Sequence, residues 1–190
     1  SAIKVAGDTP VPVDIGCDNL IDPEAIESAI SPRTVGIMPT QLNGRTCAMD
    51  PILNIAKKYD LFIVEDAAQA LGAMYKGQAA GTFGLASDIS FFPAKVLGCF
   101  GDGGAVLVKD KNLHERIYQI HDHGRDINDG LVKRWGRNSR LDNVQAAILS
   151  HKLKSYSDVI KRRRAVATIY QERLGAIEEL CLPAAPDSNP

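Results

Sequence analysis

The chain has 190 residues, with 22 Lys and Arg against 23 Asp and Glu, so its formal net charge is -1. This length is sufficient for one substantial hydrophobic core. The near balance of charge gives no electrostatic argument for nucleic acid or a membrane surface as a partner. The one locally basic run, residues 161–164, is expected to be the solvated face of a helix. No apolar run is long enough to cross a bilayer.

The first part of the chain alternates short apolar runs with short amphipathic segments. Two pairs, Asp22-Pro23 and Asp50-Pro51, are typical helix starts, because aspartate caps the helix and proline fits its first turn. The alternation predicts βαβ units and a mostly parallel sheet flanked by helices, an α/β fold. The expected elements are a strand over 11–15, a helix over 22–30, a buried strand over 34–38, a helix over 50–59 and a buried strand over 61–64.

The second part of the chain adds strands over 88–92 and 105–108 and a helix over 110–121 that Asp110 caps. A polar, glycine-bearing loop over 123–138 then leads to a largely helical stretch over 141–174. The chain opens on what reads as the tail of a helix and ends in a loop, so we expect it to be a piece of a longer polypeptide. The helical stretch has apolar positions at roughly helical spacing, namely Val144, Ile148, Leu149 and Leu153.

Four cysteines lie far apart, and no two of them form a CxxC pair. Their spacing predicts neither a zinc site nor a disulfide framework. Free thiols are typical of a reducing cytoplasm, so we expect the protein there. The spacing of the four histidines does not predict a metal site either. The cysteines are Cys17, Cys47, Cys99 and Cys181.

Asp66 and Lys95 carry the main chemical signal. Ligands of parallel sheets sit beyond the carboxyl ends of the strands, and Asp66 ends the strand in LFIVED. Lys95 lies in the glycine-rich run SFFPAKVLGCFGDGG. A lysine that apolar neighbours bury can form a Schiff base with an aldehyde, and an aspartate can keep a pyridine nitrogen protonated. The pair is therefore what pyridoxal phosphate (PLP) needs, although a surface lysine and a capping aspartate are the ordinary alternatives.

Two polar residues accompany this pair. Gln69 lies three residues after Asp66 and would share its face on a helical turn, close to a bound ring. Ser90 lies five residues before Lys95, where its hydroxyl would reach a cofactor phosphate, although a buried strand serine is the commoner role. The run GDGG over 101–104 offers backbone donors. No Walker pattern follows it, and no GxGxxG opens a helix after a strand.

These residues lie in segments that resemble the DegT/DnrJ/EryC1/StrS sugar aminotransferases, which are fold type I PLP enzymes. The similarity covers nearly the whole chain, and its two central segments are the most specific. The matching segments are PVPVDIG, IDPEAIESAISPRT, IVEDAAQALGAMYKGQAAGTFG, SFFPAKVLGCFGDGGAVLVKD and GRNSRLDNVQAAILSHKL.

The resemblance implies a role for each candidate residue. Lys95 would hold PLP as a Schiff base and move protons, and Asp66 would be the partner of the pyridine nitrogen. Gln69 would contact the ring near its hydroxyl, and Ser90 would bind the phosphate. Asn138 would reach the phosphate of the cofactor in the neighbouring subunit, which implies a homodimer with shared active sites.

The resemblance also implies an activity, the transfer of an amino group from an amino acid, with glutamate the expected donor, to a nucleotide-linked keto sugar. The product would serve surface polysaccharide, glycan or antibiotic sugar synthesis. One alternative is a sugar dehydratase of the same family that uses the amine form of the cofactor (PMP), in which a histidine replaces the lysine. Lys95 argues against it. Another is a non-catalytic remnant of the fold.

The resemblance places residues 1–182 in part of a PLP-binding large domain and residues 183–190 in a linker toward a C-terminal domain. Relatives of this family have about twice this length, with a leading segment and a smaller C-terminal domain. One loop departs from the family pattern, since Gln41 and Asn43 stand where many relatives have a histidine and a tyrosine. This departure bears on the identity of the substrate.

Overall fold

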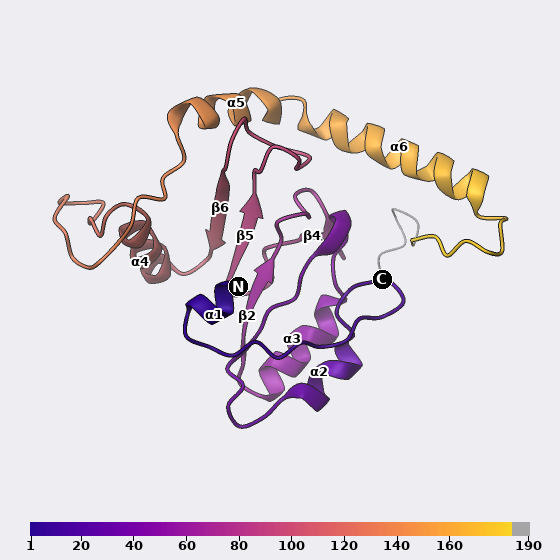
Figure 1. The fold of residues 1–190 in the computed structure, drawn as a ribbon, viewed down its shortest axis with the longest axis horizontal. Coiled ribbons are helices and arrows are strands. Elements are labelled where there is room, and N and C mark those ends of the chain that lie inside the picture. Colours follow the sequence, from indigo (N-terminus) through magenta and orange to yellow (C-terminus); the bar gives the residue numbers. More distant parts are fainter. Residues whose placement is uncertain (184–190) are drawn as a thin grey trace.

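A four-stranded sheet forms the centre of the computed structural model, which describes residues 1–183 (Figure 1). The strands run in the order β1 (Gly36–Ile37), β2 (Phe62–Asp66), β5 (Ala86–Ser90) and β6 (Gly104–Val108). The first three are parallel, and β6 is antiparallel to β5. The α/β class with a mostly parallel sheet flanked by helices is confirmed.

Two helices cover one face of this sheet. The helix α2 (Pro23–Ala29) begins as expected, because the Asp22 carboxylate accepts a hydrogen bond from the N–H of Glu24 at 2.9 Å. The helix α3 (Met49–Lys58) begins one residue before Asp50. Apolar side chains of α2, α3 and the strands form the main core. The core residues are Leu20, Ile26, Ile37, Cys47, Met49, Ile52, Ile55, Ala56, Ile63 and Tyr75.

Two expected strands are shorter in the structure or missing. The strand expected over 34–38 is reduced to β1, and the flanking Val35 and Met38 are 55% and 39% exposed. The strand expected over 11–15 is wrong, since only an isolated bridge joins Ile15 to Ile21. An apolar run pairs only where a neighbouring strand offers donors and acceptors. Smaller elements are α1 (Ala2–Val5), η1 (Leu42–Gly44) and a ribbon of β3 (Met74–Tyr75) and β4 (Gln78–Ala79).

The remaining helices follow the last strand. In α4 (Lys111–His121), Asp110 caps the N-terminus by accepting from the N–H of Leu113 at 2.7 Å, as predicted. The stretch expected to be largely helical forms α5 (Asn143–Leu153) and α6 (Tyr156–Leu174), with a break at Lys154 and Ser155.

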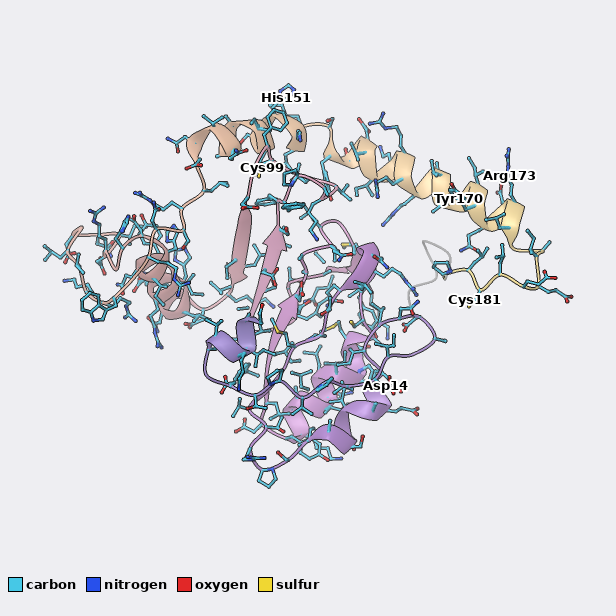
Figure 2. All side chains as sticks on the ribbon, in the orientation of Figure 1. Asp14, Cys99, His151, Tyr170, Arg173 and Cys181 are labelled. Carbon is cyan, nitrogen blue, oxygen red and sulfur yellow. The ribbon has the colours of Figure 1, made fainter. Side chains whose placement is uncertain are left out.

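The helix α6 extends past the sheet and has no buried residue, so its basic run is solvated, as expected (Figure 1). Several apolar side chains toward its C-terminal end are open to solvent as well, with Tyr170 61% exposed (Figure 2). None of the helices in residues 1–183 is long and apolar enough to cross a membrane. The linker expected over 183–190 lies outside the described residues except for Pro183.

Candidate cofactor site

Asp66 is the last residue of β2, and the chain after β1 fixes its backbone. Its N–H donates to the carbonyl of Pro39 at 3.0 Å, and its own carbonyl accepts from the N–H of Gln41 at 2.8 Å. Its Oδ1 accepts from the N–H of Ala68 at 3.2 Å, so the carboxylate caps the following turn. Its Oδ2 has no hydrogen bond within residues 1–183. Asp66 thus caps a turn and keeps one oxygen available for a ligand.

Lys95 lies in the loop that joins β5 to the antiparallel β6. The two ends of this loop are tied together, since the N–H of Phe91 donates to Gly103 at 2.8 Å and the N–H of Cys99 donates back to Phe91 at 2.9 Å. Within it, the N–H of Lys95 donates to Phe92 at 2.8 Å, which forms a tight turn. Lys95 follows the carboxyl end of β5, and Asp66 is the carboxyl end of the parallel strand β2. Both residues therefore lie at the same end of the sheet, beyond the carboxyl ends of its parallel strands.

The helix α5 is hydrogen-bonded to this loop. The N–H of Phe100 donates to Oε1 of Gln145 at 2.8 Å, and the amine of Lys152 donates to the carbonyl of Gly98. Cys99 is buried under α5, while His151 points away on the outer side of the helix (Figure 2). Leu97, Cys99 and Leu149 form a small core cluster between loop and helix.

The apolar neighbours of Lys95 bury it less than the sequence suggested. Leu97 is buried, but Phe92 and Val96 are 49% and 38% exposed. The lysine itself is half-buried, and its amine forms no hydrogen bond or ion pair within the described chain. Its amine is thus available for reaction with a ligand.

Ser90 and Gln69 occupy different surroundings. Ser90 ends β5, and its Oγ accepts from the N–H of Phe92 at 3.2 Å, which leaves its own hydrogen for a ligand. Gln69 lies in the turn after β2, in which the N–H of Ala70 donates to the carbonyl of Ala67 at 3.0 Å. Its Oε1 accepts from the N–H of Asn43 at 3.2 Å, which connects it to η1. Gln69 is exposed, and its amide nitrogen has no partner in residues 1–183.

Asn138 is separate from the other four predicted residues. It is exposed, and an isolated bridge joins it to Asp122 at the end of α4. Its Oδ1 accepts from Nε of Arg140 at 3.2 Å. Asn138 lies in the segment between α4 and α5, whereas Lys95 lies between β5 and β6. The described chain thus brings together Asp66, Ser90 and Lys95 and does not add Asn138 to them.

Sequence reasoning missed Asp88. In the parallel pairing of β2 and β5, Asp88 is the direct partner of Asp66. Burial raises the pKa of Asp88 above its ordinary value, and the negative charge of Asp66 raises it further. The positive charge of Lys95 lowers it, so the lysine lies within electrostatic reach. The available signal was its alternation with Ser90 along one face of a strand.

Glu65 is the second residue that the sequence did not single out. Its carboxylate is completely buried beside Asp66, on the other face of β2. Four donors surround it, three from the segment after β4 and one from the segment after β1. They are Nε2 of Gln41 at 2.8 Å and the N–H groups of Gly81 at 2.8 Å, Phe83 at 2.7 Å and Gly84 at 2.8 Å.

Gln41 was expected to bear on the identity of the substrate, and its surroundings in the structure indicate a different role. Gln41 is also completely buried, and its Oε1 accepts from the N–H of Cys47 at 2.7 Å. Both ends of its amide are therefore used inside the protein, and it does not face a substrate. Asn43 is exposed, with a left-handed φ of 57°, so the departure at Asn43 still bears on ligand choice.

Comparisons with known proteins identify the family of the chain. The profile of the DegT/DnrJ/EryC1/StrS aminotransferase family matches residues 1–189. A dTDP-3-amino-3,4,6-trideoxy-alpha-D-glucose transaminase of Streptomyces venezuelae is 42% identical over 192 residues, which cover 100% of this chain and 50% of the relative. The chain therefore belongs to the DegT/DnrJ/EryC1/StrS aminotransferase family.

Two further relatives extend the comparison. A UDP-2-acetamido-2-deoxy-3-oxo-D-glucuronate aminotransferase of Pseudomonas aeruginosa is 44% identical over 169 residues, covering 88% of this chain and 47% of the relative. The crystal structure of S. venezuelae DesV in complex with a ketimine intermediate superposes with a TM-score of 0.91 at 40% identity, covering 97% of this chain and 50% of that one. The chain thus spans about half the length of the curated relatives it matches.

Proposed function

We propose that this chain supplies the PLP-binding part of an enzyme that transfers an amino group from an amino acid to a nucleotide-linked keto sugar. The observation that carries the proposal is the meeting of Asp66 and Lys95 at one edge of the sheet, in a chain of this family. The names of the relatives, which include a dTDP-sugar and a UDP-sugar aminotransferase, support the substrate class.

The chemistry of the donor set fits PLP. The cofactor needs an amine, an acceptor for its ring nitrogen and donors for its phosphate. Lys95 has an amine without a hydrogen-bond partner in residues 1–183, Asp66 has an available carboxylate oxygen, and Ser90 has a hydroxyl hydrogen to donate. When bound, PLP draws electrons from the carbon next to the amino group.

Each residue then has a separate task. Asp66 would hold a proton on the ring nitrogen, and Ser90 would bind the phosphate. Lys95 would hold the cofactor through its amine and would carry a proton to or from the carbon next to the amino group. Gln69 contributes a contact near the ring hydroxyl through its amide nitrogen, while its oxygen stays bound to Asn43.

The two alternatives have less support. A dehydratase of the same family has a histidine in place of the lysine, and this chain has Lys95. A non-catalytic remnant would have no need for Asp66, Ser90 and Lys95 at one edge of the sheet. The ketimine intermediate in the solved relative supports amine chemistry on this fold, with an amino acid, expected to be glutamate, as the donor.

We also propose a homodimer with shared active sites, in which Asn138 reaches the cofactor phosphate of the partner subunit. The exposure of Asn138 supports this arrangement, because its side chain is accessible to a second subunit. Residues 1–182 would belong to the large domain and 183–190 to a linker. The free cysteines support a cytoplasmic enzyme.

The test uses the longest natural polypeptide that contains these residues, mixed with PLP. The proposal expects a visible absorption band that borohydride reduces, and a mass increase on the peptide that carries Lys95. Glutamate should then convert the band, and a nucleotide-linked keto sugar should restore it. The choice of sugar is found by screening dTDP- and UDP-linked ketones.

Two variants make this test specific. Lys95→Ala should abolish the reducible band. Lys76→Ala should keep it, because Lys76 is an exposed lysine whose amine pairs with Asp50 at 2.7 Å. A band that survives in Lys95→Ala, or a parent protein without any band, would refute the proposed site.

A further inference from the structure

The turn that carries Lys95 is closed at its base and open to solvent on its outer side. At the base, the N–H of Cys99 donates to the carbonyl of Phe91 at 2.9 Å, so the residues between them form a closed turn. On the outer side, Pro93 and Ala94, the two residues before Lys95, are exposed. The place of the lysine therefore depends on how the base of the turn is fixed.

One face of α5 contacts this base. Gln145, Leu149 and Lys152 follow one another at helical spacing, so their side chains share a face of the helix. Oε1 of Gln145 accepts from the N–H of Phe100 at 2.8 Å, and the amine of Lys152 donates to the carbonyl of Gly98. Leu149, between them, is buried in a core cluster with the same loop. The face thus binds the loop by two polar contacts and one apolar contact.

Lys152 is held by more than one group of the loop. Besides its bond to Gly98, its amine lies 5.0 Å from the centroid of the Phe100 ring, within the range of attraction between a cation and an aromatic face. A lysine on a helix surface otherwise keeps its rotamer freedom and its charged end in water. The half-buried Lys152 gives up both to contact the backbone of this loop.

Gly98 transmits the contact to the other side of the turn. A Cβ at Gly98 would lie 2.6 Å from the carbonyl oxygen of Pro93 and 2.7 Å from that of Phe92, so these backbone segments are tightly packed. Gly98 follows Lys95, whereas Phe92 and Pro93 precede it. Whatever fixes Gly98 therefore fixes the backbone on both sides of the lysine.

We propose that Gln145 and Lys152 are positioning residues, which hold the turn so that the amine of Lys95 meets the aldehyde of PLP. The inference rests on the proposed function, because it assigns α5 a role toward the cofactor-binding lysine. Neither residue reacts; both act through the backbone of Gly98 and Phe100. Correct placement of reacting groups accelerates a reaction, and a misplacement of about 1 Å costs on the order of 10²-fold.

The experiment follows the capture of PLP by the cofactor-free protein, in the longest natural polypeptide that contains these residues. Stopped-flow absorbance at rising PLP concentrations gives a half-saturating concentration and a limiting rate. The limiting rate reports the step in which the amine of Lys95 bonds to the aldehyde carbon and the aldehyde oxygen leaves as water. In Lys152→Met and Gln145→Met this rate should fall on the order of 10-fold. The half-saturating concentration should change little, because Asp66 and Ser90 are intact.

Conservative variants and a matched control make the test specific. Lys152→Arg keeps a donor for Gly98 and Gln145→Glu keeps an acceptor for the N–H of Phe100, so both should restore most of the limiting rate. Lys154→Met should leave the rate unchanged, because Lys154 is an exposed lysine at the C-cap of α5. Circular dichroism confirms that each variant is folded, and an alanine variant replaces a methionine variant that is not.

The outcomes separate this inference from the proposed function. If the parent captures PLP on Lys95 and both methionine variants keep its limiting rate, the positioning role is refuted and the proposed function stands. If the rate falls and the arginine and glutamate variants do not restore it, the two hydrogen bonds are not the cause and the inference also fails. If the parent captures no PLP, the proposed function fails and the inference with it.

Discussion

Gln41 donates a hydrogen bond from Nε2 to Oε2 of Glu65 at 2.8 Å, and both side chains are completely buried. The pair joins the segment after β1 to the end of β2, directly beside Asp66. A buried carboxylate is stable only while neutral donors or cations surround it. The position of Asp66 therefore depends on a buried hydrogen-bond network around Glu65, the residue that precedes it.

Gln41→Leu should destabilise the protein. The substitution removes one of the four donors to Glu65 and leaves the N–H of Cys47 without its acceptor. The expected loss is about 2 to 4 kcal/mol in the free energy of unfolding, measured with urea. Gln78→Ala, which removes an exposed amide that donates to Thr82, should change it much less. Equal losses in both variants would contradict the network.

Asp66→Asn should separate cofactor attachment from turnover. Lys95 and Ser90 remain, so the borohydride-reducible band should persist. The amide cannot hold the ring nitrogen protonated as a carboxylate does, so the rate of the first half-reaction with glutamate should fall on the order of 10² to 10³-fold. Stopped-flow absorbance measures this rate. Asp142→Asn, at the start of α5, is the control, and an unchanged rate in Asp66→Asn would exclude the assigned role.

Gly98→Ala should distort the turn that carries Lys95. A Cβ at Gly98 would lie 2.6 Å from the carbonyl oxygen of Pro93 and 2.7 Å from that of Phe92, which are backbone atoms with little freedom to move. We expect weaker capture of PLP with the fold retained. Gly16→Ala is the control, since its Cβ would meet only the side chain of Asp18, with Oδ1 at 3.1 Å, in a segment far from Lys95 in sequence. Titration of the visible band with PLP gives both affinities.

The two buried and two exposed cysteines should differ in reactivity. Burial raises the pKa of Cys47 from 9.0 to about 11, so its thiol stays protonated and unreactive in the native protein. Iodoacetamide at pH 8.5 should modify the exposed Cys17 and Cys181 and leave Cys47 intact until urea is added. Peptide mass spectrometry identifies the modified residues, and native labelling of Cys47 would contradict the structure.

The same thiol should make stability fall at high pH. Between about pH 9 and pH 11 the unfolded chain has lost the proton of Cys47 while the folded chain keeps it. The contribution of Cys47 to the free energy of unfolding is therefore fully present below about pH 9 and is lost as pH rises toward about 11. In Cys47→Ala this part of the decrease should be absent, which urea unfolding of both proteins between pH 8 and pH 11 would show.

A mixture of Lys95→Ala and Asn138→Ala subunits tests the shared site. Each variant alone should be inactive at limiting PLP. In a mixed dimer, one of the two sites has an intact Lys95 from one subunit and an intact Asn138 from the other, so activity should return after the subunits are mixed and reassembled. If activity does not return while mixed dimers form, Asn138 does not serve the partner's site.

Local chemistry explains which parts of the fold could be predicted. Asp22 and Asp110 cap helices through contacts two or three residues away, and such contacts are visible in a sequence. The strand expected over 11–15 failed because pairing depends on a neighbour that no local pattern supplies. The antiparallel direction of β6 was likewise not predictable, since it depends on the hairpin that carries Lys95.

The candidate site divides in the same way. Asp66 and Lys95 were recognisable because a strand end and a glycine-rich turn mark their positions. Comparison with relatives linked Gln41 to the choice of substrate, but in the structure its side chain is completely buried. Burial depends on the folded chain and could not be read from the sequence around Gln41. Asp88 was missed, since its meaning comes only from its register with a strand that is distant in sequence.

The central position of β5 has a consequence for folding. This strand pairs with β2 on one side and β6 on the other. A shift of its register by one residue would exchange its two faces. Asp88 would then enter the tightly packed side that Ile89 occupies, where a carboxylate would have no cation, and Ile89 would be turned outward. The polar residues of β5 thus oppose misaligned pairings of the strand that precedes the Lys95 loop.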